Sequence, residues 1–319
     1  MKKATAVTAA LSLSAAAAAL ALAGAHAFYR RVYTVPSGKR SRGGFSPIPA
    51  LGEEERAQTR ALIAALDERP FERVSILSFD GLRLNGRLYH TRDGAPLAIL
   101  CHGWQGTPTR DFCGGANACF DMGFNVLLIE QRAHCSSEGR ATTLGVNERL
   151  DCLAWCRYAE SRFGTDTPVL LVGISMGAAA VLMASELALP ENVRGIVADC
   201  PFTSPEAILR SIGEAHAAPV RLIMPLARLG ARVFGGFSLV GQANAAEAVR
   251  HARVPILLIH GEADDLVPCA MSREIAAANP ALVELHTFPG AGHGLSYLAD
   301  TQRYTRILRA FCARVLNEG

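Results

Sequence analysis

Gly173–Gly177 (GISMG) is a G-x-S-x-G pentapeptide with Ser175 at its centre. An apolar run, Val169–Val172, precedes it, and a helical pattern begins at Met176. A serine held between a strand and a helix lies on a sharp, strained turn, which requires residues without side chains two positions to either side. The two glycines meet that requirement. The pattern predicts a nucleophile elbow with Ser175 as the nucleophile.

A serine hydroxyl becomes reactive when a neutral imidazole removes its proton and a carboxylate fixes the tautomer of that imidazole. Downstream of Ser175, Asp264 follows the apolar run Leu257–Ile259, and His293 lies in the glycine-rich Ala291–Gly294 (AGHG). The chain order serine, aspartate, histidine occurs in known triads. We therefore expect Ser175, Asp264 and His293 to form a Ser-His-Asp triad.

Other residues could fill two of these roles. Asp265 adjoins Asp264, and Asp199 ends the apolar run Gly195–Ala198, where some hydrolases place the acid. His102 is an alternative base, although a histidine in its position more often orders its own loop.

Cys101–Gly106 (CHGWQG) follows the apolar run Leu97–Cys101. In known hydrolases with a nucleophile elbow, a loop after an earlier strand and the residue after the nucleophile each supply one backbone N–H to the oxyanion of the acyl-transfer intermediate. We expect Trp104 and Met176 to be these donors.

The elements that must position these residues alternate along the chain. A hairpin is expected around Asp80-Gly81, and helical patterns separate the apolar runs that follow it. Those runs are Leu97–Cys101, Val126–Ile129, Val169–Val172, Gly195–Ala198, Ile256–Ile259 and Val283–Phe288. Apolar strands separated by helices indicate an α/β fold, with a mainly parallel sheet of about eight strands and helices on both faces.

The alternation stops from Thr203 to about Ala252, where the sequence is helical and apolar. This stretch is too long for a plain loop and too short for an ordinary domain. We interpret residues 203–252 as a small helical lid that favours a hydrophobic acyl or leaving group.

Over roughly residues 72–316 the chain resembles serine hydrolases of the α/β-hydrolase fold family. It is similar to a membrane-anchored bacterial branch that includes esterases and serine aminopeptidase-like enzymes. The matching strings are CHGWQG (101–106), EQRAHCSSEG (130–139), GISMG (173–177), IHGEADDLVP (259–268) and AGHG (291–294). In the family the aspartate follows the strand–HG turn by three residues, which maps onto Asp264. The family usually has glycine where this chain has Cys135, so the thiol could alter the pocket.

The resemblance implies a carboxylic ester or other small acyl substrate, cleaved through an acyl-enzyme. The same triad also serves peptidases, amidases and acyltransferases, and some proteins of this fold bind ligands without catalysis. Asp at the elbow would have indicated dehalogenase or epoxide hydrolase chemistry, which Ser175 excludes.

Composition and motifs narrow the partners. Residues 1–42 carry seven basic and no acidic side chains, whereas the rest of the chain has a net charge of −4. A mildly acidic body lacks the basic surface that nucleic acid requires. The sequence has no G-x-x-x-x-G-K-[ST] and no H-E-x-x-H, and Gly290–Gly294 fails G-x-G-x-x-G because Leu295 stands at the last position. We expect no nucleic acid, no cofactor and no metal.

Ala4–Ala27 is uncharged and long enough to cross a bilayer as a helix. Lys2 and Lys3 precede it, and aromatic and basic residues follow it, as at the ends of membrane helices. We expect a single-pass anchor outside the hydrolase fold. The alternative is a secreted protein released by cleavage at the A-x-A site Ala25–Ala27.

The cytoplasmic side is favoured by the basic residues after this segment and by nine cysteines without a C-x-x-C pair, which suit a reducing compartment. The expected domains are an N-terminal membrane anchor or signal segment (1–34), a linker with a surface helix (35–70), and an α/β-hydrolase domain with the lid insertion (71–319).

Overall fold

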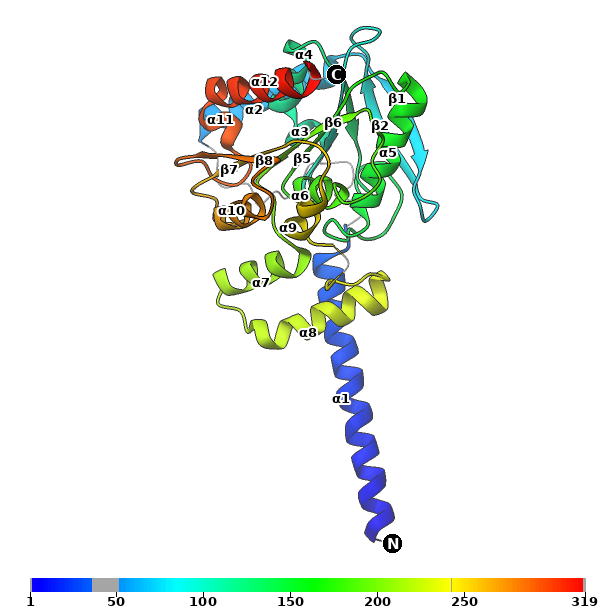
Figure 1. The fold of residues 1–319 in the computed structure, drawn as a ribbon. Helices are drawn as coiled ribbons and strands as arrows, with labels where there is room; N and C mark the ends of the chain where they lie inside the picture. Colours follow the sequence, from blue (N-terminus) through cyan, green and yellow to red (C-terminus); the bar gives the residue numbers. More distant parts are fainter. Residues whose placement is uncertain (1, 36–51, 242, 318–319) are drawn as a thin grey trace.

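An eight-stranded sheet lies at the centre of the described part of the chain (Figure 1). The computed structural model describes residues 2–35, 52–241 and 243–317, and most side chains from residue 16 onward. The strands are β1 (Glu72–Leu77), β2 (Arg83–Tyr89), β3 (Leu97–Cys101), β4 (Asn125–Ile129), β5 (Val169–Ile174), β6 (Val193–Asp199), β7 (Ile256–Gly261) and β8 (Val283–Phe288).

The strand order is β1-β2-β4-β3-β5-β6-β7-β8, and only the pairs that include β2 are antiparallel. This confirms the mainly parallel sheet with an antiparallel hairpin at one edge. The hairpin connection is longer than the tight turn that Asp80-Gly81 predicts. Residues 78–82 form it, because the Ser78 hydroxyl oxygen accepts the Leu82 N–H at 2.8 Å and closes a wider loop.

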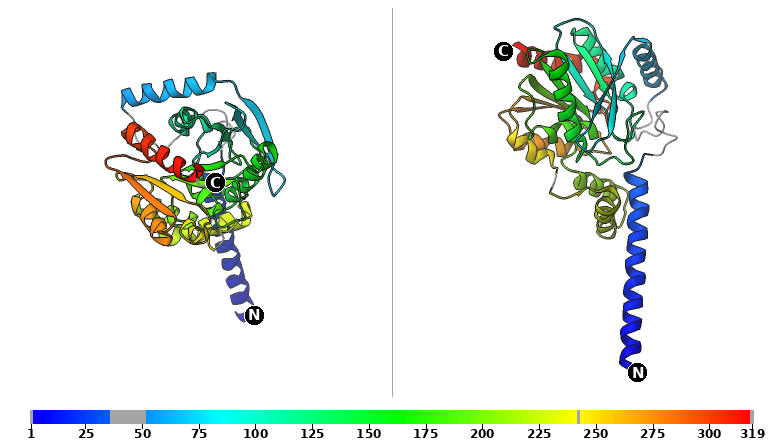
Figure 2. Two further views of the ribbon diagram at one scale, coloured as in Figure 1. Left: turned by 45° about the horizontal axis from the view of Figure 1, so that its top comes forward. Right: turned by 90° about the vertical axis from the view of Figure 1, so that its right-hand side faces the viewer.

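Helices cover both faces of the sheet, as predicted (Figure 2). One apolar cluster joins the sheet to α2 (Glu53–Glu68), α4 (Cys113–Asp121) and α12 (Thr301–Asn317). The other joins it to α5 (Glu148–Phe163), α6 (Met176–Ala184) and α10 (Cys269–Ala278). Two short helices, α3 (Pro108–Asp111) and α11 (Ser296–Ala299), lie in the connections after β3 and β8.

The predicted lid contains α7 (Pro205–Ala215), α8 (Val220–Gly230), a π-helical turn η2 (Ala231–Gly235), α9 (Ala245–Ala248) and a short 3-10 helix η3 (Val249–His251). Within it, α8 lies beside the N-terminal helix α1 (Lys2–Val32), whose first part extends away from the body (Figure 1).

The expectation that the N-terminal segment lies outside the fold is wrong for its last third. Ala25 is completely buried, and a Cβ on Gly230 of α8 would lie 2.6 Å from the Ala25 carbonyl oxygen. Tyr33 is also completely buried, and the Thr142 N–H donates to its carbonyl oxygen at 2.8 Å. Small residues at the crossing let the two helices approach closely, so α1 packs on the lid rather than standing free.

No helix in the described residues is both long and apolar enough to cross a bilayer. The side chains of residues 4–15, which form half of the predicted anchor, lie outside the described residues, as does the predicted linker at 36–51.

Candidate active site

Ser175 lies between β5 and α6 with a strained backbone, φ 55° and ψ −117°. The glycines on either side are required sterically. A Cβ on Gly177 would lie 1.8 Å from the Cys101 carbonyl oxygen, and one on Gly173 would lie 2.3 Å from the Gly177 carbonyl oxygen. The turn therefore has the geometry of a nucleophile elbow, with the hydroxyl at the carboxyl end of the sheet.

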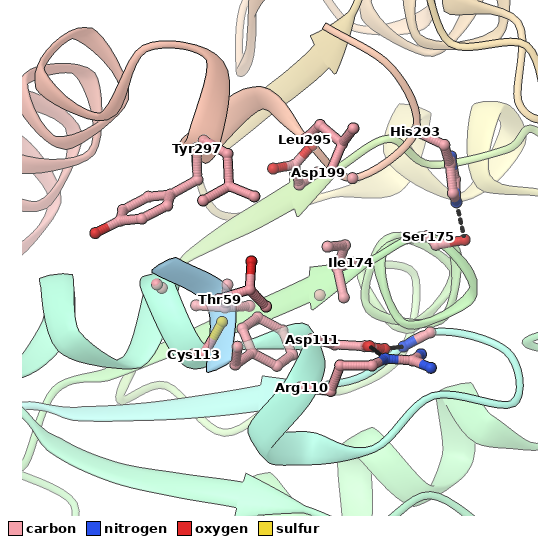
Figure 3. Close-up of a pocket in the computed structure, with 18 of the residues that line it drawn as sticks. Thr59, Arg110, Asp111, Cys113, Ile174, Ser175, Asp199, His293, Leu295 and Tyr297 are labelled. Atoms are coloured by element: carbon pink, nitrogen blue, oxygen red, sulfur yellow. Dashed lines mark hydrogen bonds and ion pairs between the residues drawn. The ribbon is translucent and has the colours of Figure 1, made fainter. Parts of the chain in front are cut away.

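Three side chains from separate strand ends meet here in one line of hydrogen bonds. Figure 3 shows the bond between His293 and Ser175. His293, in the loop after β8, has its Nε2 2.9 Å from Ser175 Oγ. Asp264 lies in the loop after β7, and its Oδ2 is 2.7 Å from His293 Nδ1. The structure thus brings together the three residues that the sequence singled out.

The local contacts of Asp264 keep its carboxylate ionised. Its Oδ1 accepts the N–H groups of Leu266 and Val267 at 3.0 and 2.8 Å. Burial alone would raise its pKa, but hydrogen bonds from His260 and His293 outweigh burial and hold the pKa well below its usual range. An ionised Oδ2 accepts the Nδ1–H of His293, which leaves Nε2 free to accept a proton from Ser175.

None of the alternative residues is hydrogen-bonded into this line. Asp265 is exposed, next to the buried Asp264. Asp199 is buried, but its carboxylate makes no hydrogen bond to His293 within the described residues. The His102 ring contacts the Gly103 carbonyl oxygen at 2.9 Å and accepts the Gln131 N–H at 3.1 Å. Burial lowers the pKa of His102 to about 3, so it is a neutral ring that holds its own loop.

The loop after β3 passes directly beside the elbow, since a Cβ on Gly103 would lie 3.3 Å from Ser175 Cβ. Trp104, one of the two expected oxyanion donors, follows Gly103. Met176, the other, is the first residue of α6, where a backbone N–H has no acceptor within the helix.

Two residues that the sequence interpretation missed hold this loop in place. Asp111 Oδ2 accepts the Gly103 N–H at 2.9 Å, and His134 Nε2 accepts the Gln105 N–H at 3.0 Å. Arg110 pairs with the second oxygen of Asp111 at 2.7 Å. A pair of opposite charges in the first helix after the loop was the available signal for Asp111. His134 carried none beyond its place in the EQRAH string.

A pocket of about 130 Å³ opens beside Ser175 and His293. Its apolar walls include Phe112, Val172, Ile174, Leu295 and Leu298. None of the lining residues belongs to the 203–252 segment of the described chain, so the lid does not form the pocket wall that we expected. Instead α2, α4 and α11 surround it, because they cover the carboxyl edge of the sheet.

Two cysteines near the site have surroundings that favour no chemical role for the thiol. Cys135 does not line this pocket but a separate surface hollow with Thr107 and Glu130. Cys200 has its sulfur close to Asp264 and His293, the one grouping of metal-ligand type in the described residues. Burial raises the pKa of the Cys200 thiol, so the protonated sulfur is a poor metal ligand.

Known families match two parts of the chain. Residues 96–218 match the family described as alpha/beta hydrolase fold, and residues 231–297 match the family described as serine aminopeptidase, S33. The esterase Pf2001 of Pyrococcus furiosus superposes with a TM-score of 0.65 at 20% identity, over 90% of this chain and 98% of that one. The chain has the α/β-hydrolase fold.

Other similar proteins extend over most of this α/β-hydrolase-fold chain. The structure of Est1E from Butyrivibrio proteoclasticus, with ferulic acid bound, has a TM-score of 0.58 at 19% identity and covers 76% of this chain and 99% of its own. An uncharacterized Mycobacterium tuberculosis protein is 28% identical over 241 residues, 75% of this chain and 78% of its own. An uncharacterized Bacillus subtilis protein is 22% identical over 226 residues, 70% and 73% of the two chains.

Proposed function

We propose that the protein is a serine hydrolase that cleaves carboxylic esters. The observation that carries the proposal is the unbroken line of hydrogen bonds from Ser175 Oγ through His293 to the buried Asp264. Such a line activates a hydroxyl for attack on a carbonyl carbon. The esterases among the similar folds support the ester as the bond attacked.

In the proposed reaction, His293 Nε2 takes the Ser175 proton as Oγ attacks the carbonyl carbon. The backbone N–H groups of Trp104 and Met176 stabilise the oxyanion. His293 then donates the proton to the leaving alcohol, and an acyl-enzyme remains on Ser175. Water attacks the acyl-enzyme with His293 as base, which releases the acid and restores the serine.

An amide or peptide bond is the second candidate. The match of residues 231–297 to the serine aminopeptidase family favours it, because that segment includes Asp264 and His293. The same triad protonates an amine leaving group as readily in principle as an alcohol.

Kinetics on matched ester and amide substrates test both candidates. An organophosphonate ester probe should label Ser175 covalently, and Ser175→Ala should lose the label and at least several orders of magnitude in turnover. Ser211→Ala, on α7 outside the pocket, is the matched control and should keep both. Undiminished labelling of the Ser175→Ala variant would contradict the proposal.

We further propose that α1 attaches the protein to a membrane, with the catalytic domain on the cytoplasmic side. Exposed apolar side chains support this at the place where α1 meets the lid: Leu20, Leu22, Leu222, Val233 and Phe234. Arg30, Arg31 and Arg221 lie in the same helices and suit anionic headgroups. N-terminal sequencing of membrane and soluble fractions tests it, since a soluble protein that starts at Phe28 would contradict the anchor.

A further inference from the structure

Several of the buried polar atoms that lack a hydrogen-bond partner belong to residues around the pocket beside Ser175. Seven buried side-chain nitrogen or oxygen atoms have no hydrogen-bond partner in the described residues. Three of them belong to residues that line this one pocket: Thr59 Oγ1, Arg110 Nη1 and Asp199 Oδ1. Buried polar groups in folded proteins almost always have partners, so three unpartnered atoms on the residues around one cavity point to an occupant that supplies partners.

Asp199 is the most deeply buried of the three, with 5% of its surface exposed. It ends β6, the strand next to the nucleophile, and its carbonyl oxygen accepts the Ser175 N–H at 2.8 Å. Burial raises the pKa of this carboxyl to about 6, against smaller opposing effects of the His260 ring and of a hydrogen bond with Tyr304. At neutral pH the carboxyl is largely ionised, and its Oδ1, which has no hydrogen-bond partner in the described residues, remains a strong acceptor.

Thr59 reaches the pocket from α2, a helix that sequence patterns indicate as a surface element. Figure 3 shows Ser175 and His293 on one side of the drawn pocket, while Thr59 and Tyr297 lie on the other. Between these sides the walls are apolar, with Ile174 and Leu295 among them. A substrate chain that extends from the scissile carbonyl toward Thr59 therefore crosses apolar surface before it meets polar atoms.

We propose that the preferred substrates are esters whose acyl or alcohol chain carries a hydroxyl group, which donates to Asp199 Oδ1. A hydroxyl can also accept a hydrogen bond from a donor such as Thr59 or Arg110, so it is the smallest neutral group that can partner either kind of unpartnered atom. An ammonium has no lone pair to accept a hydrogen bond, so it suits Asp199 alone. This inference rests on the proposed ester hydrolysis.

The test compares kcat/KM for p-nitrophenyl hexanoate with its 3-hydroxy, 6-hydroxy and 6-amino derivatives, and for butyl with hydroxybutyl hexanoate. One hydroxylated ester should exceed its plain counterpart by about tenfold or more, as expected for a hydrogen bond to a charged acceptor. Asp199→Asn and Thr59→Val should each lower that ratio. Thr165→Val, an exposed threonine outside the pocket, is the matched control and should keep it.

The outcomes separate the two proposals. Hydrolysis of plain esters without any advantage for a hydroxyl overturns the substrate assignment and leaves the ester hydrolase intact. Preference for the amino ester overturns it as well. Failure to cleave every ester, with no labelling of Ser175, overturns both. If Asp199→Asn does not fold, the Thr59→Val ratio decides, because that substitution changes only a hydroxyl for a methyl group on a half-buried side chain of α2.

Discussion

The carboxyl edge of the sheet and the junction of α1 with the lid are held together by different kinds of contact. At the sheet edge, Ser175, Asp264 and His293 each follow their own strand within a few residues and are joined by hydrogen bonds. At the junction, Ala25 and Gly230 meet backbone to backbone, although about two hundred residues separate them in the sequence. The sheet edge is fixed by the local geometry of its strand ends. The junction depends on the small size of the residues at one helix crossing.

The difference teaches where each region is sensitive. Polar atoms at the sheet edge have few acceptable positions, so changing one atom there alters chemistry. Among the described residues, the junction has only one weak polar contact, from the Tyr33 hydroxyl to the Ala227 carbonyl oxygen at 3.5 Å, so added volume is what disturbs it, and its disturbance should affect stability before activity.

The largest effect should come from the acid of the proposed triad. Asp264→Asn should lower kcat by about 10⁴-fold, because the amide favours the wrong His293 tautomer, as measured for a serine protease triad. The exposed neighbour Asp265→Asn is the control and should change kcat little. Steady-state kinetics on one ester decide between them, and a reversed pattern would place the acid one residue away.

A second prediction concerns His102, the buried ring that holds the loop of the proposed oxyanion hole. The folded-state pKa of His102 is about 3, below its unfolded value of 6.5. Its contribution to stability is therefore complete above pH 6.5 and is lost as the pH falls toward 3, by about 1.4 kcal/mol per pH unit. Urea unfolding at pH 7 and pH 4.5 should show a steeper loss for the wild type than for His102→Gln. Equal losses would contradict this account of the loop.

The helix crossing gives a smaller effect of another kind. Gly230→Val places a side chain against the Ala25 carbonyl oxygen and should lower the free energy of unfolding by about 1–3 kcal/mol. Arg232→Val adds the same side chain at an exposed position nearby and serves as the control. If Gly230→Val unfolds like the wild type, α1 does not pack on the lid in solution.

The smallest effect should come from Cys135, whose backbone has a left-handed φ of 47°. Glycine adopts this conformation without strain, so Cys135→Gly should raise the free energy of unfolding by up to about 1 kcal/mol. Cys156→Gly, inside a helix, should instead be destabilising. Thermal unfolding of both variants measures the contrast, and a loss of stability in Cys135→Gly would remove the strain argument.

The same contrast explains what the sequence could and could not predict. The strands and the candidate triad were predictable, because apolar runs, glycines and the serine, aspartate and histidine follow one another within short stretches. The junction of α1 with the lid was not, since Gly24, Ala25 and Gly230 show no periodic signal and a close crossing depends on what lies opposite.

The pocket walls were also beyond sequence patterns. Thr59 lies in a polar helix that looks like surface, and nothing in its neighbours indicates that α2 borders the pocket. Asp111 had a weak local signal, whereas the lid, which looked like a pocket wall, lies elsewhere because its apolar face is taken by α1 and the body.

The indole nitrogen of Trp104 donates to the carbonyl oxygen of Val32 at 3.2 Å, so the last turn of α1 is a neighbour of the proposed oxyanion hole. The A-x-A site at Ala25–Ala27 divides α1 into one part that packs on the lid and one part that packs on the body. A cut there would strip Gly24 and Ala25 from the lid but leave Val32 and Tyr33 seated against the body. A chain cut at this site would thus lose the contacts of Gly24 and Ala25 with the lid. It would keep the hydrogen bond between Val32 and Trp104, which holds the loop beside Ser175. Recombinant chains begun after residue 35 would lose that hydrogen bond as well, and their kinetics would describe a different enzyme.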